Sequence, residues 1–233
     1  MERERLIVFL GGVRRSVLHS LLVIGIVSLV SFFFAKDLFS LLTKVVGIKL
    51  YYFTLPEVFF SMVELALLSG TFFSVPFILF IVWKNLKPTF RISFYYFLAA
   101  GVLFYLGSLF CYLFVLKSGI MFLLGYGGEH VKPFISIERY IVFSGAFIFA
   151  FGLTFQTPIL LLLLRKLGLI KYDTLAKHRR LAILLITIFA AVITPTPDVY
   201  NMLLLAGPTY LLYEVGSLMV KMDELRRRRS GDR

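Results

Sequence analysis

"ITPTPDVYNMLLLAGPTYLLYEVG", residues 193–216, interrupts an apolar run with three prolines and two carboxylates. These residues are Pro195, Pro197, Pro208, Asp198 and Glu214. An ionisable side chain inside a bilayer is costly, so it is expected to serve a function or to have a partner. A proline supplies no N–H to a helix, so the first two prolines predict a break and Pro208 predicts a bend. The stretch therefore predicts the last two helices of a membrane protein.

The composition of the whole chain agrees with a membrane protein. Of its 233 residues, 59% are hydrophobic and 16% are charged. An average soluble domain is about 45–50% apolar and about 25% charged. The apolar residues fall in long runs separated by short basic stretches, which is typical of a polytopic membrane protein. Because backbone groups in lipid need partners within their own segment, we predict an all-α integral membrane protein.

Six apolar runs are candidates for membrane spans. They are residues 16–35, 57–83, 92–116, 140–164, 181–194 and 199–220. A span needs about 20 residues, whereas the fifth run would reach only about 21 Å of a core about 30 Å thick. We expect the last two helices to be short. With bends at Pro76, Pro158 and Pro208, the six helices are expected to form a concave bundle within one domain of residues 1–233.

The basic residues predict the orientation of the chain. Most Lys and Arg residues lie before residue 16, in the second and fourth loops, or in the tail at residues 221–233. Cytoplasmic loops are the ones enriched in Lys and Arg, so both termini and this basic tail are expected in the cytoplasm. The net charge of +12 then reflects topology and attraction to anionic lipid headgroups, and no nucleic-acid partner is expected.

The sequence offers no constellation for catalysis or metal binding. The single cysteine, Cys111, lies in an apolar run, and His19, His130 and His178 are expected in different layers of the protein. We therefore expect no enzymatic activity, no metal and no cofactor. A six-span transporter for a small solute is an alternative, but the halves show no inverted repeat of the kind many transporters carry.

Several polar residues within or beside the spans are candidates for contacts with partner helices. They are Gln156, Glu57, Glu64, Asp198 and Glu214. Structural roles remain open for some of them. Glu57 and Asp198 are placed to stabilise the first turn of a helix. Gln156 is placed to bond a backbone carbonyl released by Pro158.

Four stretches of the chain carry a family resemblance. Residues 193–216 resemble the signature of the TatC family, in which T-P-x-x-D precedes a run like L-L-A-x-P-x-Y-L-L-Y-E. "LPEVFFSMVELALLSGTFFSVPFILFIVWKNLKP" (55–88) resembles the family's second helix with its approach, "LFYLGSLFCYLFVL" (103–116) the third, and "AFGLTFQTPILLLLLRKLGLI" (150–170) the fourth. The resemblance covers nearly the whole chain in order.

The resemblance implies a function. TatC proteins are the receptor subunits of the twin-arginine translocase in the cell inner membrane, and they are not enzymes. They recognise signal peptides that carry paired arginines, self-associate in the receptor complex, and work with single-span partners of the TatA and TatB type. Together these proteins move folded cargo across the membrane, driven by the proton-motive force.

This chain departs from the family pattern at three acidic positions. The family's H-L-x-E-L-R is "FLGGVR" at residues 9–14, which keeps Arg14 but has Gly12 in place of the glutamate. The position of the family's second glutamate falls near Thr89, where this chain has no carboxylate. Gln156 stands in place of the family's third glutamate. Because carboxylates bind guanidinium groups best, these changes predict a basic pocket that binds signals weakly, unless Glu2 or Glu4 substitutes. The chain is then a divergent member, either a second copy beside a standard receptor or a receptor with an altered signal preference.

Overall fold

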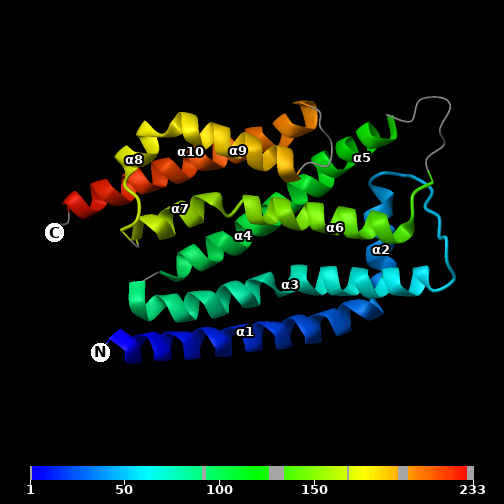
Figure 1. The fold of residues 1–233 in the computed structure, drawn as a ribbon, viewed down its shortest axis with the longest axis horizontal. Helices are drawn as coiled ribbons and strands as arrows, with labels where there is room; N and C mark the ends of the chain where they lie inside the picture. Colours follow the sequence, from blue (N-terminus) through cyan, green and yellow to red (C-terminus); the bar gives the residue numbers. More distant parts are fainter. Residues whose placement is uncertain (1, 91–92, 126–133, 167, 194–198, 230–233) are drawn as a thin grey trace. The chain divides into compact units, whose positions relative to one another are not determined.

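A computed structural model describes residues 2–90, 93–125, 134–166, 168–193 and 199–229. Side chains are described for residues 16–84, 93–125, 134–166, 168–192, 199 and 202–225. The described residues form helices joined by short connections (Figure 1). Their only β-type pairing is an isolated bridge between Tyr51 and Ser136. The prediction of an all-α protein is therefore confirmed.

Eleven helical segments follow one another along the described chain. They are α1 (Glu2–Phe33), α2 (Ala35–Lys44), α3 (Glu57–Phe90), α4 (Phe94–Phe110), the π-helix η1 (Cys111–Val115), α5 (Leu116–Gly125), α6 (Ile137–Thr154), α7 (Thr157–Lys166), α8 (Tyr172–Lys177), α9 (Arg179–Ile193) and α10 (Val199–Arg229). Within these residues, five helical stretches are long and apolar enough to cross a membrane. They are Ser16–Phe33, Glu57–Lys84, Phe94–Gly125, Ile137–Thr154 and Met202–Leu225.

The fifth predicted helix is short and the sixth is not. α9 has 15 residues, close to the predicted run 181–194. α10 has 31 residues, so the prediction of a short last helix is wrong. Residues 221–229 contain Leu, Met, Glu, Lys and Arg but no Gly or Pro, and these residue types sustain a helix beyond the apolar stretch. Part of the predicted basic tail therefore belongs to α10, while the count of six spans stays a prediction.

The chain divides into two compact units. Unit 1 comprises Met1–Gly101 and Pro133–Ala146, and unit 2 comprises Val102–Lys132 and Phe147–Arg233. In unit 1, α1 and α3 lie side by side and run in opposite directions (Figure 1). Gly70 of α3 faces Ser28 of α1 so closely that any added Cβ would overlap the Ser28 side chain and backbone. This close approach fixes the register of the two helices.

Unit 2 is organised around α10. This helix packs against α7, α8 and α9. At Gly216, an added Cβ would lie 2.9 Å from the Cα atom of Pro158 in α7. Glycine therefore permits α7 and α10 to approach each other at backbone distance. The fully buried side chains of this unit include Phe151, Leu205 and Val220, which form its apolar core.

Candidate functional site

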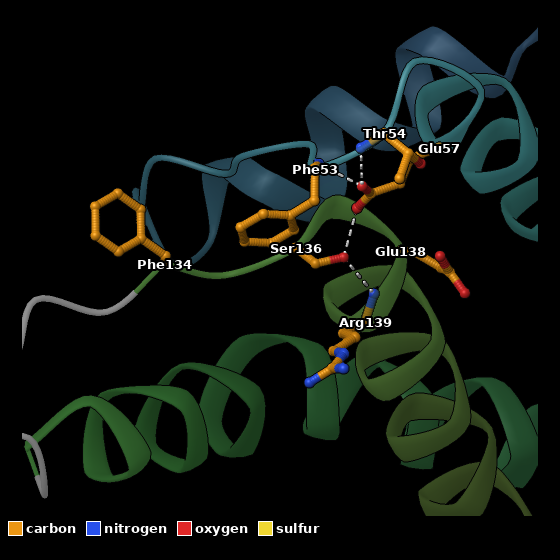
Figure 2. Close-up of a pocket in the computed structure, with 7 residues that line it drawn as sticks. All are labelled: Phe53, Thr54, Glu57, Phe134, Ser136, Glu138 and Arg139. Carbon is orange, nitrogen blue, oxygen red and sulfur yellow. Dashed lines mark hydrogen bonds between the residues drawn. The ribbon is translucent and has the colours of Figure 1, made fainter.

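Glu57 joins the loop before α3 to the start of α6 in unit 1 (Figure 2). One of its carboxylate oxygens accepts the backbone N–H of Phe53 at 2.5 Å and that of Thr54 at 3.2 Å. The other oxygen accepts the Ser136 hydroxyl at 2.6 Å. Only 6% of Glu57 is exposed. Its position in the first turn of α3, with three donors on the carboxylate, supports the structural role anticipated for it.

The same junction surrounds a cavity of about 370 Å³. Its lining residues are Phe53, Thr54, Glu57, Phe134, Ser136, Glu138 and Arg139. Both Glu57 oxygens are already bonded, and the exposed Glu138 and Arg139 side chains point away from each other (Figure 2). Among the described residues, no group of three or more His, Cys, Asp or Glu side chains could hold a metal ion. The junction therefore fixes a loop, with the Glu57 carboxylate taken up by the Ser136 hydroxyl and two backbone N–H groups.

Glu64 lies two turns further along α3 and is in a different situation. Its Oε2 atom is buried and has no hydrogen-bond partner among the described residues. The hydroxyl of Ser61, one turn earlier, is likewise buried without a partner in the described structure. A buried polar group without a partner costs free energy. Glu64 therefore has a carboxylate oxygen that the described residues leave unsatisfied, and its contact with a partner stays a prediction.

Gln156 lies in unit 2 where the predicted fourth helix breaks. Its backbone N–H donates to the carbonyl of Leu153 at 2.9 Å, which leaves the Gly152 carbonyl without its helical donor. The Gln156 side-chain Nε2 donates to that Gly152 carbonyl at 3.5 Å. Pro158 supplies no N–H to Thr154, whose carbonyl instead accepts the Thr157 hydroxyl at 2.6 Å. The local geometry thus gives Gln156 a structural bond at the break between α6 and α7.

The three prolines occupy different helical positions. Pro158 is the second residue of α7, a first-turn position where the missing N–H costs little. Pro76 and Pro208 lie inside α3 and α10, which continue beyond them. Bending at these two positions stays a prediction.

Glu214 pairs with basic and phenolic groups in unit 2. One oxygen accepts the Arg179 guanidinium at 3.1 Å, and the other accepts the Tyr210 hydroxyl at 2.9 Å. The Glu214 and Arg179 side chains are 24% and 44% exposed. This pair connects the start of α9 to the middle of α10.

Glu224, which the sequence analysis did not single out, fastens the segment around α8. Its Oε1 atom lies 3.0 Å from Nε of Arg165 at the end of α7, and it accepts the backbone N–H of Tyr172 at 3.1 Å. Lys221 lies over the Tyr172 ring, 5.2 Å from its centroid. The Tyr213 hydroxyl adds a bond to the Leu175 carbonyl at 3.0 Å. We call these contacts the α10 clasp.

The residues predicted to bind signal peptides lie at one end of unit 1. Glu2, Glu4, Gly12 and Arg14 belong to the N-terminal part of α1, and Thr89 belongs to the last turn of α3. Because the two helices run in opposite directions, these two ends coincide (Figure 1). The side chains of these residues and all of Asp198 lie outside the described part of the chain. The structure thus brings the two helix ends together and leaves the roles of these residues as predictions.

An aromatic cluster at this same end was also missed by the sequence analysis. Trp83 and Phe80 of α3 meet Phe94 and Phe97 of α4, with ring centroids 5.1–6.3 Å apart. The spacing of three residues within each pair, on either side of a short connection, was the available signal. We refer to these four residues as the aromatic cluster.

Comparison with known proteins extends this picture. The family model of the Sec-independent protein translocase protein (TatC) matches residues 9–208. The chain belongs to the TatC family. The TatC protein of Carboxydothermus hydrogenoformans is 31% identical over 220 residues, which cover 91% of this chain and 90% of that protein. The TatC protein of Aquifex aeolicus is 31% identical over 225 residues, covering 91% and 93%.

A solved TatC structure is similar throughout its length. The crystal structure of the twin-arginine translocase receptor TatC in the detergent DDM superposes with a TM-score of 0.78 at 30% identity. The match covers 91% of this chain and 99% of that chain. TatC proteins are components of a protein translocase and act as membrane receptors, not as enzymes. Membership of this family decides against the small-solute transporter.

Proposed function

We propose that this chain is the subunit of a twin-arginine translocase that recognises the signal peptides of folded cargo. The observation that carries the proposal is the similarity to the twin-arginine translocase receptor over 91% of this chain. The proposed binding site is the end of unit 1 where the start of α1 meets the end of α3 (Figure 1). Arg14 and the position of Gly12 on α1, with the region of Thr89 on α3, would contact the signal.

The proposed partners are small single-span proteins of the TatA and TatB type. Glu64, with its buried and unbonded Oε2, is a described residue that a polar partner side chain could satisfy. We also propose that the chain self-associates in the receptor complex and that the proton-motive force drives export. The two units would act as one membrane domain, which is supported by the family match across both.

The proposed location is the cell inner membrane, with both termini in the cytoplasm. The distribution of Lys and Arg supports this orientation, and α9 would be a sixth, short span. A short span is accommodated by local thinning of the bilayer. The basic residues of α10 beyond Leu225 would then lie at the cytoplasmic surface.

Site-specific crosslinking tests the binding site. A photoreactive amino acid placed at Gly12 is expected to crosslink to a twin-arginine signal peptide in membranes that contain the intact protein. The same group at Leu29, an exposed residue 67% accessible near the other end of α1, serves as the matched control. Equal crosslinking at both positions, or none at Gly12, would contradict the proposed site. Crosslinking of a signal peptide with both arginines replaced by glutamine measures how strongly binding depends on the arginine pair.

A second candidate is a divergent receptor that binds signals weakly. The missing carboxylates favour it, because residues 5–36 and 65–128 contain no Asp or Glu. Under this alternative, crosslinks from Gly12 would form only at high peptide concentration. Export would then depend on a second TatC copy in the same cell.

A further inference from the structure

The aromatic cluster leaves part of its ring surface uncovered. The Trp83 and Phe94 centroids lie 5.3 Å apart with ring planes at 78°, the edge-to-face packing that aromatic pairs prefer. The ring centroid of Phe97 lies 5.1 Å from that of Phe94. The ring centroid of Phe80 lies 5.8 Å from those of both Trp83 and Phe97. Despite these contacts, Phe94 is 48% exposed and Phe80 is 44% exposed. Phe94 and Phe80 thus present aromatic surface at the edge of the cluster, next to the half-buried Trp83.

The cluster lies level with the N-terminal part of α1. Gly70 of α3 faces Ser28 of α1, and the two helices run in opposite directions (Figure 1). An α-helix rises about 1.5 Å per residue. A residue of α3 and a residue of α1 that are the same number of residues from this contact, toward the same end, therefore lie at the same height along the helix pair. By this register Trp83 lies level with Arg15, and the next turn of α3 lies level with Gly12. The aromatic cluster and the proposed signal-binding positions therefore share one end of unit 1.

Apart from Glu2 and Glu4 at the start of α1, carboxylates are scarce at this end. Residues 5–36 of the α1 region and residues 65–128, which include the end of α3 and the start of α4, contain no Asp or Glu. The same stretch of α1 contains the basic residues Arg14 and Arg15 in its sequence. A cationic ligand there cannot rely on net charge and needs short-range contacts. The negative faces of aromatic rings supply such contacts, and guanidinium groups stack on them especially well.

We propose that the aromatic cluster holds a guanidinium group of the signal's arginine pair by cation–π contact, with Trp83 as the main specificity-determining residue. This inference rests on the proposed function and names the chemistry by which that same site recognises its ligand. Tryptophan is the strongest partner for such contacts. The contact should contribute about 2- to 30-fold in affinity. An aromatic cluster that serves only as an interfacial anchor would contribute nothing to the choice of peptide.

The single tryptophan of the chain makes the test direct. Growth on tryptophan with one, two or three ring fluorines labels only Trp83, and it weakens the negative ring face with little change of shape. We would measure the affinity of a labelled twin-arginine signal peptide for the full-length protein in detergent. The expected result is a stepwise loss with each fluorine, about 2- to 30-fold in total. A peptide with both arginines replaced by glutamine should show no such series.

Two substitutions provide matched controls. Phe94→Leu removes a ring from the aromatic cluster and should lower the affinity for the twin-arginine peptide. Phe60→Leu removes a comparably exposed ring, 56% accessible, at the opposite end of α3 and should leave it unchanged. Because the fluorinated proteins keep all side chains in place, their result stands even where Phe94→Leu impairs folding.

The outcomes separate the inference from the proposed function. If the unmodified protein prefers the twin-arginine peptide but fluorination leaves its affinity unchanged, the cation–π contact is wrong and the receptor function stands. If the unmodified protein shows no preference for arginine over glutamine, both are overturned.

Discussion

Arg179 at the start of α9 donates to Glu214 in α10 across 3.1 Å, and so ties the short helix to its neighbour within unit 2. α9 is only 15 residues long and exposes Leu184, Leu185 and Ile188 on its surface. A helix this short has few internal contacts to hold its position. Specific polar links to α10 are therefore expected to matter for its placement.

A double-mutant cycle measures this link. Arg179→Gln, Glu214→Gln and the double variant should give a coupling energy of about 0.2–1 kcal/mol, because both side chains are partly exposed and water screens the pair. Thermal unfolding in detergent provides the measurement. A coupling indistinguishable from zero would show that the pair does not hold α9 in place.

The α10 clasp should be stronger than this pair. The Glu224 and Arg165 side chains are only 14% and 19% exposed, and Glu224 also accepts the Tyr172 N–H. Glu224→Ala is expected to cost about 1–3 kcal/mol and to loosen the segment around α8. Tryptic cleavage near Lys171 should accelerate, whereas Asp173→Asn, an exposed change in α8, should leave the rate unchanged. Unchanged cleavage in Glu224→Ala would refute the clasp.

Glu57 should control the order of the loop before α3. Glu57→Ala removes the acceptor of two backbone N–H groups and of the Ser136 hydroxyl. Amide hydrogen exchange at Phe53 and Thr54 should speed up about 10- to 100-fold. Ser136→Ala, which removes one of these bonds, should have a smaller effect at the same amides. Equal protection in all three proteins would mean that Glu57 does not fix the loop.

Alanine substitutions at two glycines of α10 should change the stability of the protein in opposite directions. At Gly216 the new Cβ would meet the Pro158 backbone at 2.9 Å, so Gly216→Ala is expected to destabilise unit 2 by about 1–3 kcal/mol. At Gly207 nothing lies within 4 Å, so Gly207→Ala should stabilise the helix by about 0.5–1 kcal/mol. Unfolding temperatures that shift in the same direction would contradict the close packing of α7 on α10.

Restoring a carboxylate tests the depleted binding site. Gly12→Glu should raise the affinity for a twin-arginine peptide, because a charge-assisted hydrogen bond is worth about 1.5–3 kcal/mol. The peptide-binding assay with an arginine-to-glutamine control peptide measures this. An unchanged affinity would place the site elsewhere, or would show that Glu2 and Glu4 already serve. Gly12→Gln separates the added charge from the added side chain.

The sequence predicted the helical class well because runs of apolar residues constrain backbone structure in lipid. It also anticipated the short α9, from a run of 14 residues at 181–194, and the place of Glu57 in the first turn of α3. The acceptor expected for Gln156 was wrong, because its side chain bonds the Gly152 carbonyl and the carbonyl released by Pro158 accepts the Thr157 hydroxyl instead. The length of α10 was missed, because a basic segment without hydrophobic periodicity was interpreted as a tail. Helix propensity and the Glu224 contacts keep that segment helical.

Contacts between residues distant in the sequence were beyond prediction. Glu224 lies among basic residues, and nothing local identifies Arg165 or the Tyr172 N–H as its partners. The aromatic cluster likewise depends on the start of α4 meeting the end of α3. The signal-binding residues Gly12, Arg14 and Thr89 stay predictions, since their side chains lie outside the described part of the structure.

Export of a folded reporter in a strain that lacks its own TatC tests the central claim most directly. We predict that this chain, supplied with its native single-span partners, restores export of a twin-arginine reporter and not of the same reporter with a twin-glutamine signal. Failure to restore export, with the protein present in the membrane and its partners supplied, would contradict its role as the signal receptor.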